Sequence, residues 1–491
     1  MGHAIGSEPG RDVDDESRGY GSTGRFMGAG ELKRIVAEIG PRRVFVLSDR
    51  YPPDTAGGAE LSLHLLMREA PLRDQAMVVT FEKTLASPAH RRLDGVDIVA
   101  LPANAAWPLH RLSQDQVERL KRLPYGLKWP AFIGEAMALA ARRPAVHAPA
   151  IALQLAGPPP GGVRMAHATV PEGRTQSDIR TLLDLVRPKV VHADNARSIM
   201  MAADALEGRR EPFVALVRDH RFTSLRFDQT LAPLEPSLLS LRERLAAVCA
   251  RTALAFRQTC LKRASSVVAT SAHLAETLSE VVAPSLLKRL PLEPVELPPR
   301  EEKPETGAFS ILLVGSLSNN KGQAHLIEAW PEILRRIPNA RIDVAGQGRA
   351  RAEIEALIAR HGAASRITLH GHVDASSLAV LYRRCDVVAL PTLWSEPFGR
   401  VPLEAGAAFR PVVAYAVGGL AETIVDGVTG RMIPWRDRAG FVEALADLAE
   451  DPATRRRMGE AGHARVVETY SPTRLAAMLA SVWDQAAAGK R

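Results

Sequence analysis

Short apolar runs that alternate with helical patterns constrain the fold of this 491-residue chain more than any other feature of its sequence. Each run has the length of a buried strand, and most are followed by apolar residues at helical spacing. This alternation predicts parallel sheets with helices on both faces, because parallel strands need crossover connections. We therefore expect an α/β fold of two doubly wound, Rossmann-like domains that face each other across a cleft. The runs lie at 44–48, 76–81, 96–101, 189–195, 213–217, 266–270, 311–314, 342–345, 367–369 and 386–390.

A segment dense in Pro and Glu, at 291–306, divides the two halves and predicts a linker. The run at 266–270 is expected to be the last parallel strand before it. Residues 1–30 are rich in Gly, Asp, Ser and Arg and predict a disordered tail, with a short helix from Glu31 to Ile39. The expected divisions are a tail and lead-in helix at 1–40, an amino-terminal domain at 41–293, a linker at 294–308, a carboxy-terminal domain at 309–470 and a final helix at 471–491.

The composition limits the classes of partner. The formal net charge of +8 favours anionic ligands, acidic lipid surfaces or nucleic acid. Only 5% of residues are aromatic, and no RNA-recognition or zinc-finger pattern is found, so no nucleic-acid partner is expected. Three cysteines without C-x-x-C spacing suggest a reduced protein rather than a disulfide scaffold. No signal-peptide pattern and no apolar run of spanning length is found, so we expect a cytoplasmic location.

The stretch 395–405 carries the chemistry. It follows the apolar run at 386–390, and the pattern predicts a loop from Pro391 to Pro397 and a helix from Gly399 to Phe409. The helix would begin at the carboxyl end of a strand, where open α/β sheets bind ligands, and its free N–H groups favour anions. Glu396 and Glu404 flank that helix end, and carboxylates accept hydrogen bonds from hydroxyls. Together these features predict a ligand with both phosphate and hydroxyl groups, such as a nucleotide sugar.

Glu396 and Glu404 resemble the Glu-x7-Glu signature of the retaining glycosyltransferases of family 4, which have the GT-B fold. The likeness continues through 411–414, 418–419 and 422–430 and covers roughly the last 180 residues, the size of one domain. It implies transfer of a sugar from a nucleotide-diphosphate sugar to a glycan, lipid or small molecule, with retention of anomeric configuration. Cell-envelope polysaccharide synthesis is the expected setting. It also implies that the first domain faces the acceptor, the second binds the donor, and the last helix crosses back to the first.

In the first half, 51–60 resembles the family's first loop, which faces the donor phosphates and the acceptor; a tight strand-to-helix turn is the alternative. Family members carry an aspartate-aromatic pair and a nearby histidine after the strand at 213–217. Asp219 and His220 are the candidates here, and whether Arg218, Asp219 or His220 faces the donor sugar stays open. A structural role for His220 stays equally open.

The resemblance assigns roles in the second half. Glu404 would accept the ribose hydroxyls, Glu396 a sugar hydroxyl, and Lys321 would stabilise the diphosphate. The expected catalytic residues are Lys321, Glu396, His220 and Asp219. The expected donor-binding residues are Gly57, Gly58, Gly315, Ser316, Lys321, Gly322, Gly371, His372, Val373, Glu396, Pro397, Phe398, Gly399, Arg400 and Glu404. No metal or other cofactor is expected, because cations and the helix dipole would take the metal's place.

One position departs from the family pattern. The turn usually reads Gly-Arg and then Lys-Gly; Lys321 and Gly322 match, but Ser316 replaces the arginine, which lysine cannot imitate. Arg400, or Arg218 from the facing domain, is expected to supply the missing charge. Because of this departure, one alternative function is that of an inactive partner subunit that binds nucleotide sugar. The enzymatic alternative to a glycosyltransferase is a GT-B phosphorylase or epimerase.

Other segments carry weaker signals. The helical stretch 107–160 is basic and apolar by turns and indicates either weak contact with the inner face of an anionic membrane or solvated helices over a sheet. Its cations include Arg111, Lys121, Arg122 and Lys128. Neither 346–351 nor the Lys321 loop fits a dinucleotide or P-loop motif. His370 and His372 have no acidic or cysteine neighbour in the sequence, so zinc is not expected.

Overall fold

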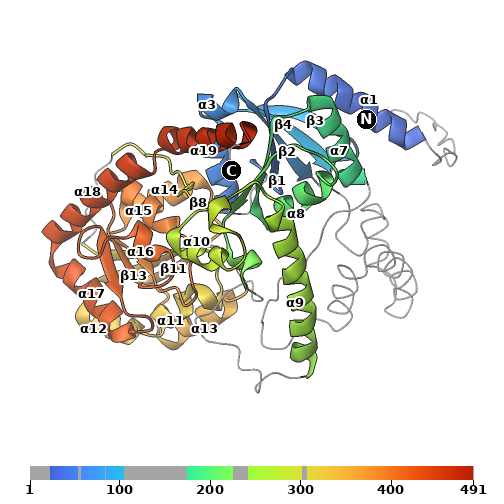
Figure 1. Cartoon of the computed structure of the whole chain (residues 1–491). Helices are drawn as coiled ribbons and strands as arrows, with labels where there is room; N and C mark the ends of the chain where they lie inside the picture. The colour runs from blue at the N-terminus through green and yellow to red at the C-terminus, as the bar shows by residue number, and fades with distance from the viewer. Residues whose placement is uncertain are drawn as a thin grey trace, which may run out of the picture.

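A computed structural model of the protein describes residues 23–53, 57–82, 85–103, 174–224, 241–300 and 307–489. Within these residues the strands form two sheets, one of eight and one of six strands, each covered by helices (Figure 1). The expected pair of doubly wound α/β domains is thereby confirmed. The basic stretch at 107–160, most of the expected tail and positions 301–306 of the expected linker lie outside the described residues.

The amino-terminal sheet has the order β3-β4-β2-β1-β5-β6-β7-β8, and its neighbours are parallel except for the antiparallel pair β3 and β4. The prediction that 266–270 is the last parallel strand is wrong, because β8 pairs in parallel with β7. The sequence did not reveal β3 and β8, since edge strands are half exposed and lack a continuous apolar run. The strands are β1 (Val44–Ser48), β2 (Ala76–Glu82), β3 (Ala89–Leu93), β4 (Val96–Pro102), β5 (Val190–Asp194), β6 (Phe213–Val217), β7 (Ser266–Ala269) and β8 (Leu287–Arg289).

Helices cover both faces of this sheet because successive side chains of a strand point to opposite faces. In β1, Phe45 and Leu47 pack into one core and Val44 and Val46 into the other. The first helix begins at Thr23 rather than Glu31, so the expected disorder does not extend through residues 23–30. The helical elements are α1 (Thr23–Ile39), α2 (Gly58–Met67), α3 (Ala70–Arg73), α7 (Arg174–Val186), α8 (Asn195–Ala205), η1 (His220–Phe222), α9 (Leu241–Lys262), α10 (Ala272–Ser279) and η3 (Pro284–Leu286).

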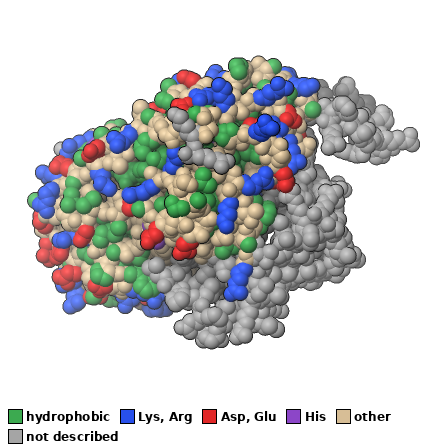
Figure 2. All heavy atoms as spheres, viewed as in Figure 1, with side chains coloured by type: hydrophobic (Ala, Val, Ile, Leu, Met, Phe, Trp, Pro, Cys, Tyr) green, Lys and Arg blue, Asp and Glu red, His purple; other side chains and the backbone are tan. Residues whose placement is uncertain are grey.

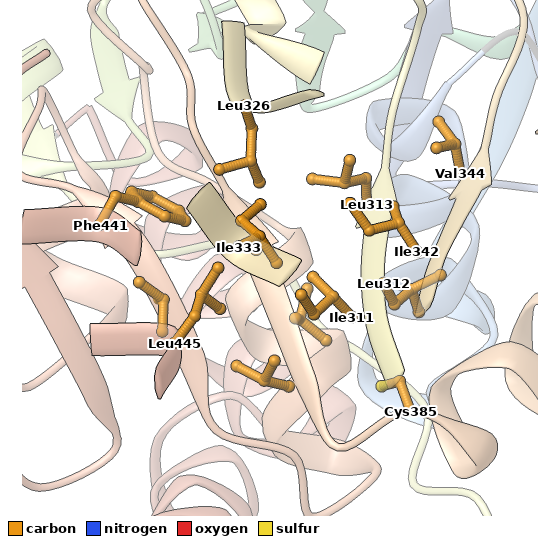
Figure 3. Close-up of a cluster of buried hydrophobic side chains, with 14 of the residues drawn as sticks. Ile311, Leu312, Leu313, Leu326, Ile333, Ile342, Val344, Cys385, Phe441 and Leu445 are labelled. Atoms are coloured by element: carbon orange, nitrogen blue, oxygen red, sulfur yellow. The ribbon is translucent and has the colours of Figure 1, made fainter. Parts of the chain in front are cut away.

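The carboxy-terminal sheet is parallel throughout and has the order β11-β10-β9-β12-β13-β14. The order reverses between β9 and β12, which makes their carboxyl ends the switch point where such sheets bind ligands. One continuous apolar core holds this domain together; Figure 3 shows Ile311 and Leu313 of β9 in the same cluster as Leu326 and Phe441. The strands are β9 (Phe309–Val314), β10 (Ala340–Ala345), β11 (Ile367–Gly371), β12 (Val387–Leu390), β13 (Val412–Tyr415) and β14 (Gly430–Ile433).

Helices flank the second sheet as they flank the first (Figure 1). The helix expected from Gly399 to Phe409 is shorter in the structure, from Val401 to Ala407, since the chain reaches helical geometry only after Gly399, whose φ is 96°. The helical elements are η4 (Asn319–Lys321), α11 (Gln323–Ile327), α12 (Trp330–Arg336), α13 (Arg351–Arg360), α14 (Ala375–Arg384), α15 (Val401–Ala407), α16 (Leu420–Thr423), α17 (Arg438–Glu450), α18 (Pro452–Thr469) and α19 (Pro472–Ala487).

The last helix, α19, lies against the amino-terminal domain and contacts α2, α3, β5 and β6 (Figure 1). Leu475, Leu479, Val482 and Trp483 are buried in the same core as Val44 of β1. These residues recur at helical spacing, so one stripe of the helix is apolar and is covered by the first domain.

The charged side chains are interspersed on the face of the molecule in Figure 2, where Lys and Arg alternate with Asp and Glu. In the part of the chain that the structure describes, no helix is both long and apolar enough to cross a bilayer.

Candidate functional site

A recess opens at the switch point of the carboxy-terminal sheet, between the carboxyl ends of β9 and β12. It holds about 480 Å³ of empty space, part of which is open to solvent. Five residues singled out from the sequence line it together: Gly315, Lys321, Glu396, Gly399 and Arg400. The residues that the sequence singled out therefore come together in one recess, although Lys321 and Glu396 are 75 positions apart in the chain.

Gly322, the residue after Lys321, allows two loops to approach each other closely. Gly322 has a φ of 72°, and a Cβ there would lie 1.8 Å from the carbonyl oxygen of Pro391. Only glycine permits this approach, which lets the turn η4 lie directly on the loop after β12, where the Leu393 N–H donates to Asn320 O at 2.8 Å. Lys321 is thereby brought to the glutamate that follows in that loop.

Lys321 and Glu396 form the central ion pair. Lys321 Nζ lies 2.8 Å from Glu396 Oε2. Trp394 Nε1 donates to the same oxygen at 2.8 Å, and Lys321 Nζ lies 5.0 Å from the centroid of the Trp394 ring. The sequence did not single out Trp394, although it stands two positions before Glu396. A charge-assisted hydrogen bond and a cation–π contact thus hold Lys321 and Glu396 in one arrangement.

Glu404 lies in the first turn of α15 and has two partners. Arg400 Nε donates to its Oε1 at 2.8 Å, and the Tyr382 hydroxyl donates to its Oε2 at 2.8 Å. Burial, followed by the charge of Glu404, raises the pKa of Tyr382 well above its ordinary value, so the hydroxyl stays a donor. Tyr382 sits on α14, and no pattern in the sequence pointed to it.

The three candidates after β6 have different positions. Arg218 donates to both carboxylate oxygens of Asp194, at 2.7 and 2.9 Å, and also to Glu293. It is buried, and although burial alone would lower its pKa, Asp194 and Glu293 raise that pKa above its ordinary value. The expectation that Arg218 replaces the arginine missing at Ser316 is therefore wrong, because this guanidinium is held inside the amino-terminal domain.

Asp219 caps its own turn: its Oδ1 accepts the Arg221 N–H at 2.9 Å, at the start of η1. His220 crosses to the facing domain, and its Nε2 lies 3.2 Å from the carbonyl oxygen of Ser395. Burial, and then the neighbouring His273, lower the pKa of His220, which keeps the ring neutral near pH 7. Of the three, His220 is the side chain that the structure brings to the loop before Glu396.

The remaining predicted residues divide by position. Gly371 and the two residues after it stand at the end of β11, where the Gly371 carbonyl accepts the Gly346 N–H at 2.8 Å. Phe398 turns its side chain into a small apolar cluster with Tyr470. The Pro397 carbonyl accepts from Ser271 of the first domain. Ser316 offers its carbonyl to Gln323 Nε2 at 3.2 Å.

His370 has no acidic neighbour in the local sequence but has one on the adjacent strand: its Nε2 lies 2.7 Å from Asp343 Oδ1. The side chains of the described residues nevertheless include no cluster of three or more His, Cys, Asp or Glu placed to hold a metal ion.

We compared the sequence and the structure with those of known proteins. Residues 296–465 match the model of the family Glycosyl transferases group 1. Among solved structures, sucrose-phosphate synthase from Thermosynechococcus elongatus superposes with a TM-score of 0.63 over 91% of this chain and 100% of its own, at 19% identity. Anabaena HepE in complex with UDP-glucose gives a TM-score of 0.57 over 90% and 99% of the two chains, at 18% identity. The fold is GT-B.

Sequence relatives match part of the chain. A glycogen synthase of Mycobacterium tuberculosis is 30% identical over 235 residues, which are 47% of this chain and 56% of that protein. A D-inositol 3-phosphate glycosyltransferase of an Arthrobacter strain is 38% identical over 159 residues, or 32% and 38% of the two chains. The chain thus spans about half or less of the length of these relatives.

Polar contacts tie the two domains of this GT-B fold together. The Glu422 carboxylate accepts the N–H groups of Ala272 and His273 at the start of α10, at 2.9 and 3.0 Å, and an Arg289 donor at 2.9 Å. A carboxylate at a helix amino terminus is stabilising. Since Glu422 belongs to the second domain and α10 to the first, this contact is one of those that hold the two domains together.

Proposed function

We propose that this protein is a retaining glycosyltransferase of family 4 that moves a hexosyl group from a nucleotide-diphosphate sugar to an acceptor. One observation carries the proposal: Lys321 and Glu396 meet 2.8 Å apart in the recess at the switch point. Glu404 stands in the helix that follows. A cation and two carboxylates at this place suit a ligand with both phosphates and hydroxyls. The match of 296–465 to group 1 glycosyl transferases supports the same conclusion.

The donor would lie in the carboxy-terminal domain. Lys321 would stabilise the negative charge that builds on the diphosphate as the bond to the sugar breaks. Glu396 would accept a sugar hydroxyl, and Glu404 the ribose hydroxyls. The remaining proposed contacts are backbone groups at Gly57, Gly58, Gly315, Ser316 and Gly322 for the phosphates, at Pro397, Phe398 and Gly399 for the sugar, and at Gly371, His372 and Val373 for the base.

The acceptor would enter from the amino-terminal domain and attack from the face that the diphosphate leaves, so the anomeric configuration is retained. His220, which the structure brings to the Ser395 carbonyl at 3.2 Å, is the side chain of the first domain that we place beside the sugar. Asp219 orders the turn that carries it. We propose that no metal and no other cofactor is needed, because Lys321 and backbone N–H groups face the phosphates.

Uridine-diphosphate sugars are the first donors to test, because HepE, which shares the fold, has been solved with UDP and with UDP-glucose. The acceptor is a glycan, a lipid or a small molecule, and cell-envelope polysaccharide is the class we propose. We place the protein in the cytoplasm, with peripheral contact with the membrane for a lipid acceptor.

A thermal-shift screen of nucleotide sugars tests the proposal. A donor at about a hundred times its dissociation constant stabilises the protein by about 2.7 kcal/mol, which a melting curve detects easily. The Glu404→Gln variant is the matched control and should respond less to the same donor. The donor that binds is then incubated with candidate acceptors, and NMR of the product reports the anomeric configuration. No stabilisation by any nucleotide sugar would contradict the proposal.

A second function is a partner subunit that binds nucleotide sugar without transferring it. Ser316 favours it, because the arginine expected there is missing and Arg218 is buried in another network. Donor binding without hydrolysis or transfer would support this function. An epimerase would instead convert a nucleotide sugar without any acceptor, and a phosphorylase would cleave a glycosidic bond of a glycan with inorganic phosphate to give a sugar phosphate. Product analysis with and without acceptor, and with and without phosphate, separates these enzymes.

A further inference from the structure

Arg400 bridges the two domains. Its Nε donates to Glu404 Oε1 at 2.8 Å in the carboxy-terminal domain. Its Nη1 donates to the Pro294 carbonyl at 2.6 Å and to Ser62 Oγ on α2. Since Nε and Nη1 belong to one rigid planar group, the position of Glu404 is tied to the position of α2.

The Ser62 end of this bridge belongs to a network of buried charged side chains. Ser62 is fully buried and donates to Glu293, which also accepts from Arg218. Arg218 in turn holds Asp194 with two hydrogen bonds. Buried charges persist only where they are paired and hydrogen-bonded. Ser62 is thereby locked in place, so it is a fixed anchor for Arg400.

Gly58 explains how the guanidinium reaches this anchor. A Cβ built on Gly58 would lie 2.7 Å from Arg400 Cδ, closer than carbon atoms can approach. Arg400 cannot swing aside without losing Glu404, Ser62 or Pro294. Gly58 is the first residue of α2 and has no left-handed backbone conformation, so the close passage of Arg400 accounts for a glycine at this position.

We infer that Arg400 is a positioning residue that couples the Glu404 carboxylate to the amino-terminal domain through the space left by Gly58. The inference rests on the proposed function, because Glu404 is there the acceptor of the donor's hydroxyls. The donor site is complete only when α2 is docked against α15. A change on the first domain that displaces Arg400 therefore weakens binding of a donor held by the second.

A double-mutant cycle tests this coupling. Gly58→Ala, Arg400→Ala and the double variant are compared with the parent, with the donor's dissociation constant measured by calorimetry and folding by a melting curve. Alanine favours a helix more than glycine does, so Gly58→Ala does not weaken α2 itself. Gly58→Ala should weaken donor binding by about tenfold in the parent, the scale of coupling between contacting residues. In the Arg400→Ala background the same change should have almost no effect.

Two controls sharpen the cycle. Gly30→Ala adds a methyl group to helix α1 where nothing lies within 4 Å, so donor affinity should stay unchanged. Arg400→Lys keeps the charge but has no planar fork, so it should bind donor as weakly as Arg400→Ala. A merely structural Arg400 would lower the melting temperature without this effect on affinity.

Different results of this cycle would overturn the coupling through Arg400 and the proposed function. Equal loss of affinity from Gly58→Ala in both backgrounds would overturn the coupling, because the added methyl group would then act on donor binding without Arg400. Parent-like binding by Gly58→Ala would overturn it as well. If the parent binds no nucleotide sugar, the proposed function fails first and the inference falls with it.

Discussion

The indole N–H of Trp394 donates to Glu396 Oε2 at 2.8 Å, the same oxygen that lies 2.8 Å from Lys321 Nζ. This shared oxygen joins an aromatic ring, a cation and a carboxylate into one unit, of which Lys321 and Glu396 line the recess. The unit positions two residues that we propose to contact the donor, and Trp394 itself is half-buried beside them.

Trp394→Leu should lower turnover by about thirtyfold, because it removes both the hydrogen bond to Glu396 and the aromatic face under Lys321, and each contact contributes roughly 1 kcal/mol. Trp394→Phe keeps the face and should retain more activity. Steady-state kinetics with saturating donor measure the difference, and melting curves check folding. Identical turnover in parent and both variants would remove Trp394 from the site.

Glu404→Gln and Lys321→Ala should affect different properties, donor binding in the first and turnover in the second. The first is nearly isosteric and should mainly weaken donor binding, because a charged acceptor makes roughly twice as strong a hydrogen bond as a neutral one. The second should lower turnover by about a hundred- to a thousandfold, since the charge is needed most as the diphosphate leaves. Calorimetry of donor binding is read beside turnover and a melting curve. If both variants fold, bind and turn over like the parent, the site lies elsewhere.

Activity should survive chelators. The donor phosphates are expected to face Lys321, and no Asp-x-Asp pair stands in a plausible donor-site loop of the sequence. The test is transfer after EDTA treatment, compared with the same sample after manganese or magnesium is added back. Lost turnover that manganese restores would show that a metal takes part.

Stability should fall in mild acid because of His192. This ring is fully buried and accepts from Trp483 Nε1 at 3.3 Å; burial, and then Arg218, lower its pKa from 6.5 to about 3. The unfolded chain therefore binds the proton more readily, so stability is lost as the pH falls below 6.5 and toward about 3. The contribution amounts to about 2 kcal/mol between about pH 7 and about pH 5.

Urea unfolding at several pH values measures this loss. His192→Asn is the comparison, because asparagine is neutral throughout and can still accept from Trp483. Its stability should change less with pH than that of the parent, even if it is lower at every pH. A parent and variant with the same slope in acid would mean that His192 is protonated in the fold.

Local sequence determined most of the framework. The strands Val44–Ser48 and Phe213–Val217 were predicted to the residue, because a strand buried on both faces must be apolar at every position. The pairing of Glu396 with Glu404 in one loop-helix segment, and the place of Lys321 after a strand, were equally visible, since each depends on neighbours in the chain.

The tertiary structure decided what each charged side chain contacts. Arg218 and Arg400 were interchangeable candidates in the sequence, yet one is buried between Asp194 and Glu293 and the other spans the domains. The contact between Arg400 and Ser62 joins residues 338 positions apart. Periodicity in the sequence shows which face of a helix or strand is apolar. The partner of a charged side chain depends instead on which distant elements the fold brings within about 3 Å. Once the pair is buried, neither charge can bind water in place of its partner.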